Sequence, residues 1–401
     1  MQFVNRSLHS NIIYLYLVKF SSWFMLYMPI VVPFYQSNGL NLKELMILQA
    51  CYSLSIVLLE IPSGYLADAL GRRLTILMGT VMGTAGFVIY SATSGFWPFL
   101  LAELTLGIGA SLISGADSAI LYDSLQDMKR EKDYTRLEGW VTSVGNFSEA
   151  AAGIAGAFLA KYISIRAPYY FQIGIAMTGI PAAILLVEPG SHLQRIKFTM
   201  RDILGVVRYA MIENRLLRRN IIYSSIIGAS TLTMAWFVQP YFQLIHIPLA
   251  WYGVLWTTLN LTVALTSVIA YKVENWLGDR LTMVMITLGI SLGYFAAGFF
   301  QAIWALTFFY VFYLVRGIAT PVLKNYVNAL TSSEIRATVL SVRSFIIRIL
   351  FAGIGPFLGW YSGKFSLPSA FILAGITFLI LGGATLAAFL VGLKLPVGRK
   401  D

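Results

Sequence analysis

GYLADALGRR, residues 64–73, closes the second long apolar stretch of the chain and has the character of a turn at a membrane surface. Asp68 ends the stretch with a charge near the interface, where it can interact with helix N-termini and with arginine. Gly71 permits a tight reversal of the backbone. Arg72 and Arg73 favour a cytoplasmic position for the turn, because cytoplasmic loops are enriched in Lys and Arg.

Apolar runs of about 20 residues recur along nearly the whole 401-residue chain, each long enough to cross a bilayer as a helix. Hydrophobic residues make up 58% of the sequence and the mean hydropathy is +0.73, which leaves too little polar surface for a water-soluble protein. The first run lacks the cleavage site of a secretory signal, so we expect it to be retained. We predict an all-α membrane protein with twelve transmembrane helices, at 12–36, 44–70, 74–93, 97–124, 138–162, 167–187, 217–245, 250–274, 282–300, 303–330, 335–362 and 368–393.

The positions of Lys and Arg orient these spans. An even number of spans places both termini on one side, and 20 of the 29 Lys and Arg residues lie on that side. Four lie at the opposite face and five lie inside spans. We therefore expect a multi-pass protein of the bacterial inner membrane with both termini in the cytoplasm. The net charge of +11 is attributed to this orientation, and no nucleic-acid partner is expected.

The two halves of the chain repeat each other. Residues 33–36 (Pro-Phe-Tyr-Gln) align with residues 240–243 (Pro-Tyr-Phe-Gln) at an offset of 207, and Gly71 meets Gly278 at the same offset. Later, Gly107-Ile108 aligns with Gly317-Ile318 at an offset of 210. Such a parallel repeat predicts two pseudo-symmetric six-helix bundles with a substrate site between them at the membrane midplane.

The expected domains are therefore an N-terminal bundle at 1–190, a linker at 191–215 and a C-terminal bundle at 216–401. The linker carries apolar residues at helical spacing, which predicts a basic amphipathic helix on the cytoplasmic membrane surface. A solvated linker is the alternative. The apolar residues are Met200, Ile203, Leu204, Val207 and Met211.

Ionisable side chains inside the predicted spans are the main functional candidates. Each costs at least about 2.5–3.5 kcal/mol on insertion scales, so each usually faces a cavity or a partner. The acids lie in the first half, and they are Glu60, Glu103, Asp117 and Glu149. Each has two interpretations, as a proton-carrying group or as a structural hydrogen-bonding group. Glu149 lies among the glycines 145, 153 and 156, where helices pack closely, and Gly64 is likewise expected to let another helix approach.

The second half carries arginines inside its spans, at Arg316, Arg343 and Arg348. Arg343 and Arg348 are five positions apart, or about 140° around a helix, so they cannot both face one point. Lys19, in the first span, is interpreted as a side chain that snorkels to the interface.

Aromatic and amide residues near mid-span are the further candidates for lining a substrate cavity; for the aromatic residues, the alternative is a place in an interfacial belt or in the core. These candidates are Trp23, Tyr27, Asn146, Trp236, Gln239, Asn260 and Asn325. His9, His192 and His246 are scattered and Cys51 is the single cysteine, so we expect no metal site and no disulfide. No catalytic residue or cofactor is expected, and the chain is not predicted to be an enzyme.

Residues 64–73 resemble the G-x-L-A-D-x-x-G-R-R/K signature of the major facilitator superfamily, which lies between the second and third spans. The resemblance implies a secondary transporter that works by rocking of its two halves. It implies gating and structural roles for Gly64, Asp68, Gly71, Arg72 and Arg73. In the family the arginine pairs with an acid at the cytoplasmic end of the fourth span, and Asp123 is the matching residue.

Two departures from the family weaken a carry-over of drug:proton antiport. Glu103 stands where many proton-coupled members have arginine in an R-x-x-x-G pattern. The fifth span lacks the proline of the antiporter motif, and Glu149 stands where its second glycine would fall.

The sequence also lacks a G-x-x-x-x-G-K-[ST] motif, so ATP is not expected to drive the protein directly. We expect a monomeric transporter in the lipid bilayer that exports a small organic or amphiphilic solute in exchange for protons. An importer of an organic anion and a non-transporting receptor are the alternatives.

Overall fold

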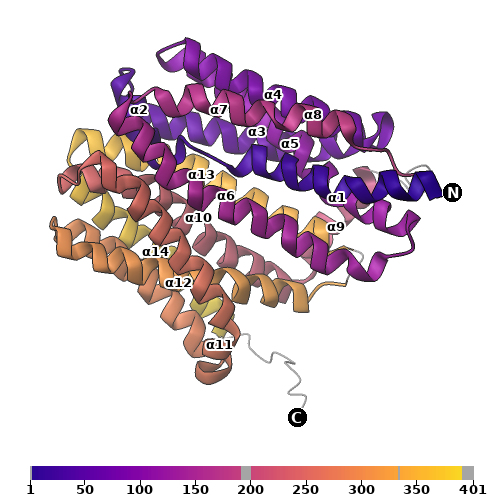
Figure 1. The fold of residues 1–401 in the computed structure, drawn as a ribbon. Coiled ribbons are helices and arrows are strands. Elements are labelled where there is room, and N and C mark those ends of the chain that lie inside the picture. The colour runs from indigo at the N-terminus through magenta and orange to yellow at the C-terminus, as the bar shows by residue number, and fades with distance from the viewer. Residues whose placement is uncertain (1, 191–199, 333–334, 391–401) are drawn as a thin grey trace. The chain divides into compact units, whose positions relative to one another are not determined.

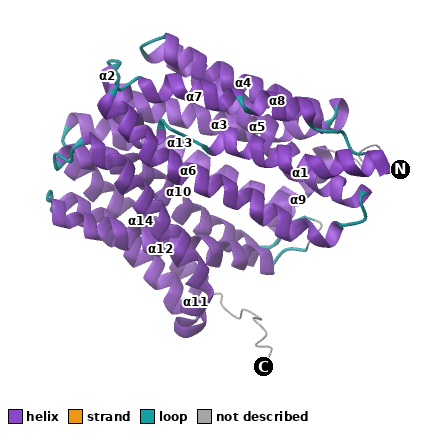
Figure 2. Cartoon of the chain, in the orientation of Figure 1, coloured by secondary structure: helices purple, strands orange, loops and turns teal. Residues whose placement is uncertain are grey.

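The computed structural model describes residues 2–190, 200–332 and 335–390, which form helices joined by short loops with no strand among them (Figure 2). The chain forms two compact units. Unit 1 comprises Met1–Lys197 and Phe242–Thr258, and unit 2 comprises Phe198–Tyr241 and Leu259–Asp401. Each unit is described below by itself.

Unit 1 contains the helices coloured from indigo to magenta in Figure 1. Two short interruptions divide its first and last spans, so that α1 and α2 form one span and α7 and α8 form another. The helices are α1 (Gln2–Trp23), η1 (Met28–Ile30), α2 (Val31–Ser37), α3 (Leu42–Leu70), α4 (Arg72–Ala92), α5 (Phe96–Asp127), η2 (Glu131–Asp133), α6 (Tyr134–Tyr162), α7 (Ala167–Met177) and α8 (Gly179–Leu185).

Unit 2 contains most of the remaining helices, although the end of α10 and the start of α11 belong to unit 1. Its helices are α9 (Met200–Arg208), η4 (Tyr209–Glu213), α10 (Arg215–Leu244), α11 (Leu249–Phe299), η5 (Ile303–Ala305), α12 (Leu306–Ala329), α13 (Arg336–Lys364) and α14 (Leu367–Leu390).

Nine helical stretches of the described residues are long and apolar enough to cross a membrane. One of them, α11, holds two of the predicted spans, which meet at Gly278, where a φ of 74° and a ψ of 162° interrupt the helix. The helix α6 and the α7–α8 pair bring the number of spans to twelve. The all-α membrane fold with twelve helices is therefore confirmed.

The sequence repeat corresponds to a repeat of backbone conformation. Gly71, between α3 and α4, has a φ of 95°, and its repeat partner Gly278 has a φ of 74°. A residue with a Cβ atom is strained at such angles. Both turns of the repeat therefore require glycine for the same reason.

The repeat is also one of packing. A Cβ atom at Gly107 of α5 would collide with Ser55 of α3, and a Cβ atom at Gly317 of α12 would collide with Thr266 of α11. Both glycines thus mark a close contact between corresponding helices. Gly64 behaves differently, because a Cβ atom there would meet no atom within 4 Å. The expectation that Gly64 admits a neighbouring helix is wrong.

The amphipathic helix α9 packs on unit 2. Its most buried residue is Val206, which clusters with Ala210 of η4, Leu217 and Ile221 of α10 and Val339 of α13. Part of its apolar face is thus covered by protein. The preceding residues 191–199 of the predicted linker lie outside the described residues.

The first span is broken in its middle. The helix α1 ends at Trp23 and η1 begins at Met28, so the backbone between them cannot complete its helical hydrogen bonds. The side chain of Gln172, on α7, accepts a hydrogen bond from the Leu26 N–H at 2.9 Å. Gly156 of α6 faces the Leu26 backbone so closely that a Cβ atom would clash there. The break is therefore held from two sides.

Candidate functional site

A buried ion pair stabilises one end of unit 1. Arg72, at the start of α4, pairs with Asp123 of α5, and the two side chains are 2% and 0% exposed. The Arg72 guanidinium also donates to the Ala119 carbonyl oxygen at 2.5 Å. This is the pairing that the superfamily resemblance implied. Asp68 lies in α3, but its side chain is outside the described residues.

Glu188 caps the same helix and was missed by the sequence reasoning. Its Oε1 atom accepts from the Arg72 N–H and its Oε2 atom accepts from the Arg73 N–H, each at 2.8 Å. A carboxylate at a helix N-terminus satisfies free N–H groups and interacts favourably with the helix dipole. Arg73 in turn donates to the Ile184 carbonyl oxygen of α8 at 2.7 Å. A lone acid at the end of the sixth span, on the side of the arginine turn, was the available signal.

A second ion pair lies within the membrane-spanning part of unit 1. Lys19 Nζ of α1 is 3.6 Å from Asp117 Oδ2 of α5, and the two side chains are 20% and 13% exposed. The same ammonium group lies 5.1 Å from the centre of the Trp23 ring. The interpretation of Lys19 as a snorkelling side chain is therefore wrong, since its charge is held by a partner inside the unit.

Hydrogen bonds extend this pair towards α6. Asp117 Oδ1 accepts from the Ser118 N–H at 2.7 Å, and the Ser118 hydroxyl donates to Glu138 Oε1 at 2.7 Å. Along α6, Glu138, Gly145 and Glu149 follow at intervals of seven and four, which places them on one helical face. A Cβ atom at Gly145 would lie 3.3 Å from the Trp23 ring, so this face turns towards α1.

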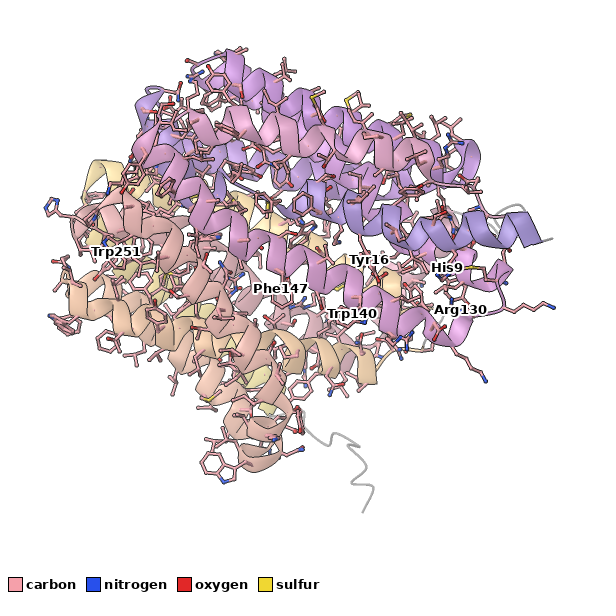
Figure 3. All side chains as sticks on the ribbon, viewed as in Figure 1. His9, Tyr16, Arg130, Trp140, Phe147 and Trp251 are labelled. Atoms are coloured by element: carbon pink, nitrogen blue, oxygen red, sulfur yellow. The ribbon has the colours of Figure 1, made fainter. Side chains whose placement is uncertain are left out.

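The opposite face of α6 is exposed. Trp140 and Phe147, labelled in Figure 3, are 58% and 75% exposed. Trp140 lies about 140° and Phe147 about 160° from Gly145 around the helix, at 100° per residue. Asn146 is also exposed, whereas Glu149 is half-buried. The helix α6 therefore has a polar face, which is turned towards α1 and α5, and an opposite face that exposes large apolar side chains.

Small residues let α6 pack closely elsewhere too, as the sequence predicted. A Cβ atom at Gly153 would lie 2.8 Å from Thr257 Oγ1, which belongs to the α11 segment of unit 1. The Thr257 hydroxyl donates to the Ala150 carbonyl oxygen at 2.9 Å.

Glu103 forms a separate buried network near the other end of unit 1. Its side chain is 4% exposed, and its Oε1 atom accepts from the Tyr35 hydroxyl at 2.6 Å and from Gln49 Nε2 at 2.5 Å. The Tyr35 and Tyr90 hydroxyls are 2.5 Å apart. Glu103 and Asp117 are separated by about 21 Å along α5, at 1.5 Å per residue, so the structure does not bring these two candidates together.

The remaining first-half candidates occupy intermediate positions. Glu60 is half-buried in α3, and its carbonyl oxygen accepts from the Ser63 hydroxyl at 3.0 Å. The Tyr27 ring, beside the break in the first span, lies 5.1 Å from the Phe87 ring and 5.4 Å from the Tyr169 ring.

The arginines of unit 2 lie on different helices. Arg343 of α13 donates from Nε to the Ser224 hydroxyl of α10, and the Arg316 guanidinium lies 5.4 Å from the Tyr313 ring within α12. Arg348 is half-buried. In the part of unit 2 that the structure describes, no carboxylate forms an ion pair with any of the three. The other candidates are buried (Gln239), half-buried (Trp236, Asn260) or exposed (Asn325).

Residues 12–350 match the profile of the family described as the Major Facilitator Superfamily. The chain belongs to this superfamily. Among curated relatives of this superfamily member, the inner membrane transport protein YajR of Escherichia coli is 26% identical over 49% of this chain and 43% of that protein. The quinolone resistance protein NorA of Staphylococcus aureus is 22% identical over 41% of each. The chain thus spans less than half the length of these curated relatives.

Solved structures with the same fold cover nearly the whole chain of this superfamily member. The nucleoside transporter NupG superposes with a TM-score of 0.78 at 13% identity, over 96% of this chain and 99% of that chain. A bacterial homologue of the lysosomal transporter Spinster gives a TM-score of 0.72 at 14% identity, over 97% and 96%. Within the described residues, no group of three or more His, Cys, Asp or Glu side chains could hold a metal ion.

Proposed function

We propose that the protein is a secondary active transporter that exports a small organic or amphiphilic solute across the bacterial inner membrane in exchange for protons. It would work as a monomer by alternating access of its N-terminal bundle (1–190) and C-terminal bundle (216–401), with both termini in the cytoplasm. Membership in a transporter superfamily supports the class of function. The name of NorA, a quinolone resistance protein, favours export.

The observation that carries the coupling proposal is the Lys19–Asp117 pair inside the membrane-spanning helices. The proton affinity of a carboxyl group depends on its hydration and on neighbouring charges. Asp117 is partly exposed and has a charged partner on another helix, so a movement of α1 against α5 would change both. Glu149 lies on the polar face of α6, which is turned towards α1 and α5. Asp117 and Glu149 are therefore the leading coupling candidates.

The other proposed roles follow from the geometry. Gly71, Arg72, Arg73 and Asp123 would stabilise one conformation at the cytoplasmic surface, together with Asp68. Glu103 is fully engaged with Tyr35 and Gln49, which favours a structural role over coupling. Trp23, Tyr27, Asn146, Trp236, Gln239, Asn260 and Asn325 remain candidates for the substrate cavity.

Import of an organic anion is the second candidate function. It is favoured by Arg316, Arg343 and Arg348, none of which forms an ion pair with a carboxylate among the described residues of unit 2. A non-transporting receptor is the alternative from a different class.

Flux into sealed vesicles tests the proposal. The purified protein would be reconstituted and assayed with a quinolone and a nucleoside as first probes, because proteins similar to it carry these names. An imposed pH gradient should accelerate flux of a transported probe. Binding of a probe without any flux would favour a receptor.

Replacement of the coupling acid by its amide should separate coupling from transport. We expect at least one of Asp117→Asn and Glu149→Gln to give a stable protein that still exchanges substrate for substrate but no longer responds to the pH gradient. Glu213→Gln is the control, because Glu213 lies outside the spans in an exposed pair with Arg208. Full pH-driven flux in both variants would exclude these two acids and leave Glu60 and Glu103.

A further inference from the structure

We propose that Asp117 and Trp23 form a binding site for an organic ammonium group, and that the ammonium group of Lys19 fills this site when no solute is bound. The proposal names a substrate class for the proposed transport function. It rests on that function only in so far as the bound solute is taken to be the transported substrate. It makes Lys19 a tethered competitor of the solute.

The contacts of Lys19 are those expected of a bound ammonium ion. Its Nζ atom faces a carboxylate oxygen of Asp117 at 3.6 Å and the indole ring of Trp23 at 5.1 Å from the ring centre. A carboxylate and the face of an indole ring are the two side-chain groups that attract an alkylammonium most strongly. An organic amine or quaternary ammonium ion would find the same two partners.

The Lys19 ammonium is held loosely enough to be exchanged. Its 3.6 Å distance to Asp117 exceeds the 2.7–3.2 Å range of a direct N–H···O hydrogen bond, so the attraction is mainly Coulombic. The lysine side chain has four flexible methylene groups and can withdraw without moving α1. By contrast, the Arg72 side chain is 2% exposed and also donates to a carbonyl oxygen, so that pair cannot open in this way.

The surroundings leave access to the site and are rich in carboxylates. Trp23 is 37% exposed, and Gly145 presents no side chain to the ring or to the Lys19 stem. Glu138 is linked to Asp117 through Ser118, and Glu149 lies on the same face of α6. The single Lys19 ammonium thus lies beside two linked carboxylates, those of Asp117 and Glu138, which favours a second cation over an anion.

The break of the first span lies directly after one wall of the site. Trp23 is the last residue of α1, and Gln172 holds the Leu26 N–H in the following turn. The Nε2 atom of Gln172 is buried and has no hydrogen-bond partner among the described residues, although its Oε1 atom accepts from Leu26. An unsatisfied buried donor costs free energy, and a movement of the break that gave it an acceptor would recover that cost.

Binding of a permanently charged probe to the purified full chain tests the proposal. Benzyltrimethylammonium cannot lose its charge, so the probe itself neither takes up nor releases a proton when its binding is measured by titration calorimetry. Lys19→Met removes the tethered ammonium and keeps the length of the apolar stem that carries it. We expect the Kd for the probe to fall about tenfold, which corresponds to 1.4 kcal/mol.

Lys364→Met is the matched control. The ammonium of Lys364 lies 5.2 Å from the Trp360 ring, as Lys19 does from Trp23, but the described residues place no carboxylate against it. This variant should bind the probe as the unchanged protein does. Trp23→Leu should weaken binding several-fold and Asp117→Asn should abolish it, and both retain Lys19. These two variants decide the question if Lys19→Met does not fold.

Two results of these binding measurements would overturn the proposal. If Lys19→Met binds benzyltrimethylammonium no more tightly and loses binding of benzoate, Lys19 is an anion ligand and the proposal is overturned. Unchanged probe binding in both Trp23→Leu and Asp117→Asn also overturns it. Because binding is measured without flux, tight binding with no transport would refute the proposed transport function and leave the ammonium site intact.

Discussion

At the scale of single residues, burial decides what an ion pair contributes. Arg72 and Asp123 lie in the protein interior, where each charge has lost its water and depends on the other. Arg130 and Asp133 form a pair of similar chemistry at the surface, with side chains 38% and 32% exposed. Water and salt can replace either partner there. The two pairs should therefore respond very differently to the same substitution.

Asp123→Asn should destabilise the protein by about 3–5 kcal/mol, because it removes the charge of the carboxylate that pairs with the buried Arg72 guanidinium. Asp133→Asn should cost about 0–1 kcal/mol, as exposed pairs usually do. The midpoint of thermal unfolding in detergent, followed by tryptophan fluorescence, measures both. Equal midpoints for the two variants would show that the Arg72 charge is stabilised by other groups.

At the scale of elements, one arginine connects three loops at the end of unit 1 that is distant from Gly71. Arg166, before α7, donates to the carbonyl oxygens of Ser91 at 3.0 Å, in the last turn of α4, and of Thr93 at 2.7 Å, in the α4–α5 connection. It also donates to Asn38, in the α2–α3 connection, and to the Ser94 hydroxyl at 2.8 Å. A planar guanidinium carries five N–H donors in a fixed arrangement, against three on a lysine ammonium, and can therefore serve all four of these acceptors at once.

Arg166→Leu should lower stability by about 2 kcal/mol or more, since hydrogen bonds to charged groups contribute about 1.5–3 kcal/mol each and some will be replaced by water. It should also expose the connections at 38–41 and 93–95 to protease. Lys161→Met is the control, because that side chain is exposed and its ammonium interacts with the side chain of the neighbouring Tyr162. Limited proteolysis with mass spectrometry identifies the sites cut. Resistance of both variants to cleavage would mean that the helices alone fix these loops.

At the scale of the whole molecule, the repeat and the charge bias determine the path of the chain. Equivalent turns at Gly71 and Gly278 share a left-handed backbone, and equivalent glycines at 107 and 317 share a close helix contact. Repeat partners Gln36 and Gln243, both in unit 1, exchange two amide hydrogen bonds, at 3.1 and 2.5 Å. The symmetry of the sequence is therefore a symmetry of local geometry.

A reporter that is active only in the cytoplasm should be active when it is fused after Asp401 or inserted within 191–215. It should be inactive when it is fused near Gly95 or Ser366, because the Lys and Arg bias places these turns outside. Activity of each fusion, normalised to its expression, measures the topology. Activity near Gly95 would overturn the orientation.

The sequence by itself determined the spans, the two special turns and the repeat. Each is local: a run of apolar residues has to span the bilayer as a helix, and a glycine at a sharp reversal is required by backbone sterics. The Arg72–Asp123 pair was found only because the signature of residues 64–73 resembles a known pattern, since nothing local joins the two residues.

The tertiary structure alone decided which side chains meet. Lys19 forms an ion pair with Asp117, Glu188 caps the N-terminus of α4, and Glu103 accepts hydrogen bonds from Tyr35 and Gln49. Each meeting depends on how far every helix is rotated about its own axis, and an apolar sequence in a membrane has little hydrophobic asymmetry to reveal that rotation. A charged residue inside a span indicates that it has a partner, but only the packing of the helices shows which residue that partner is.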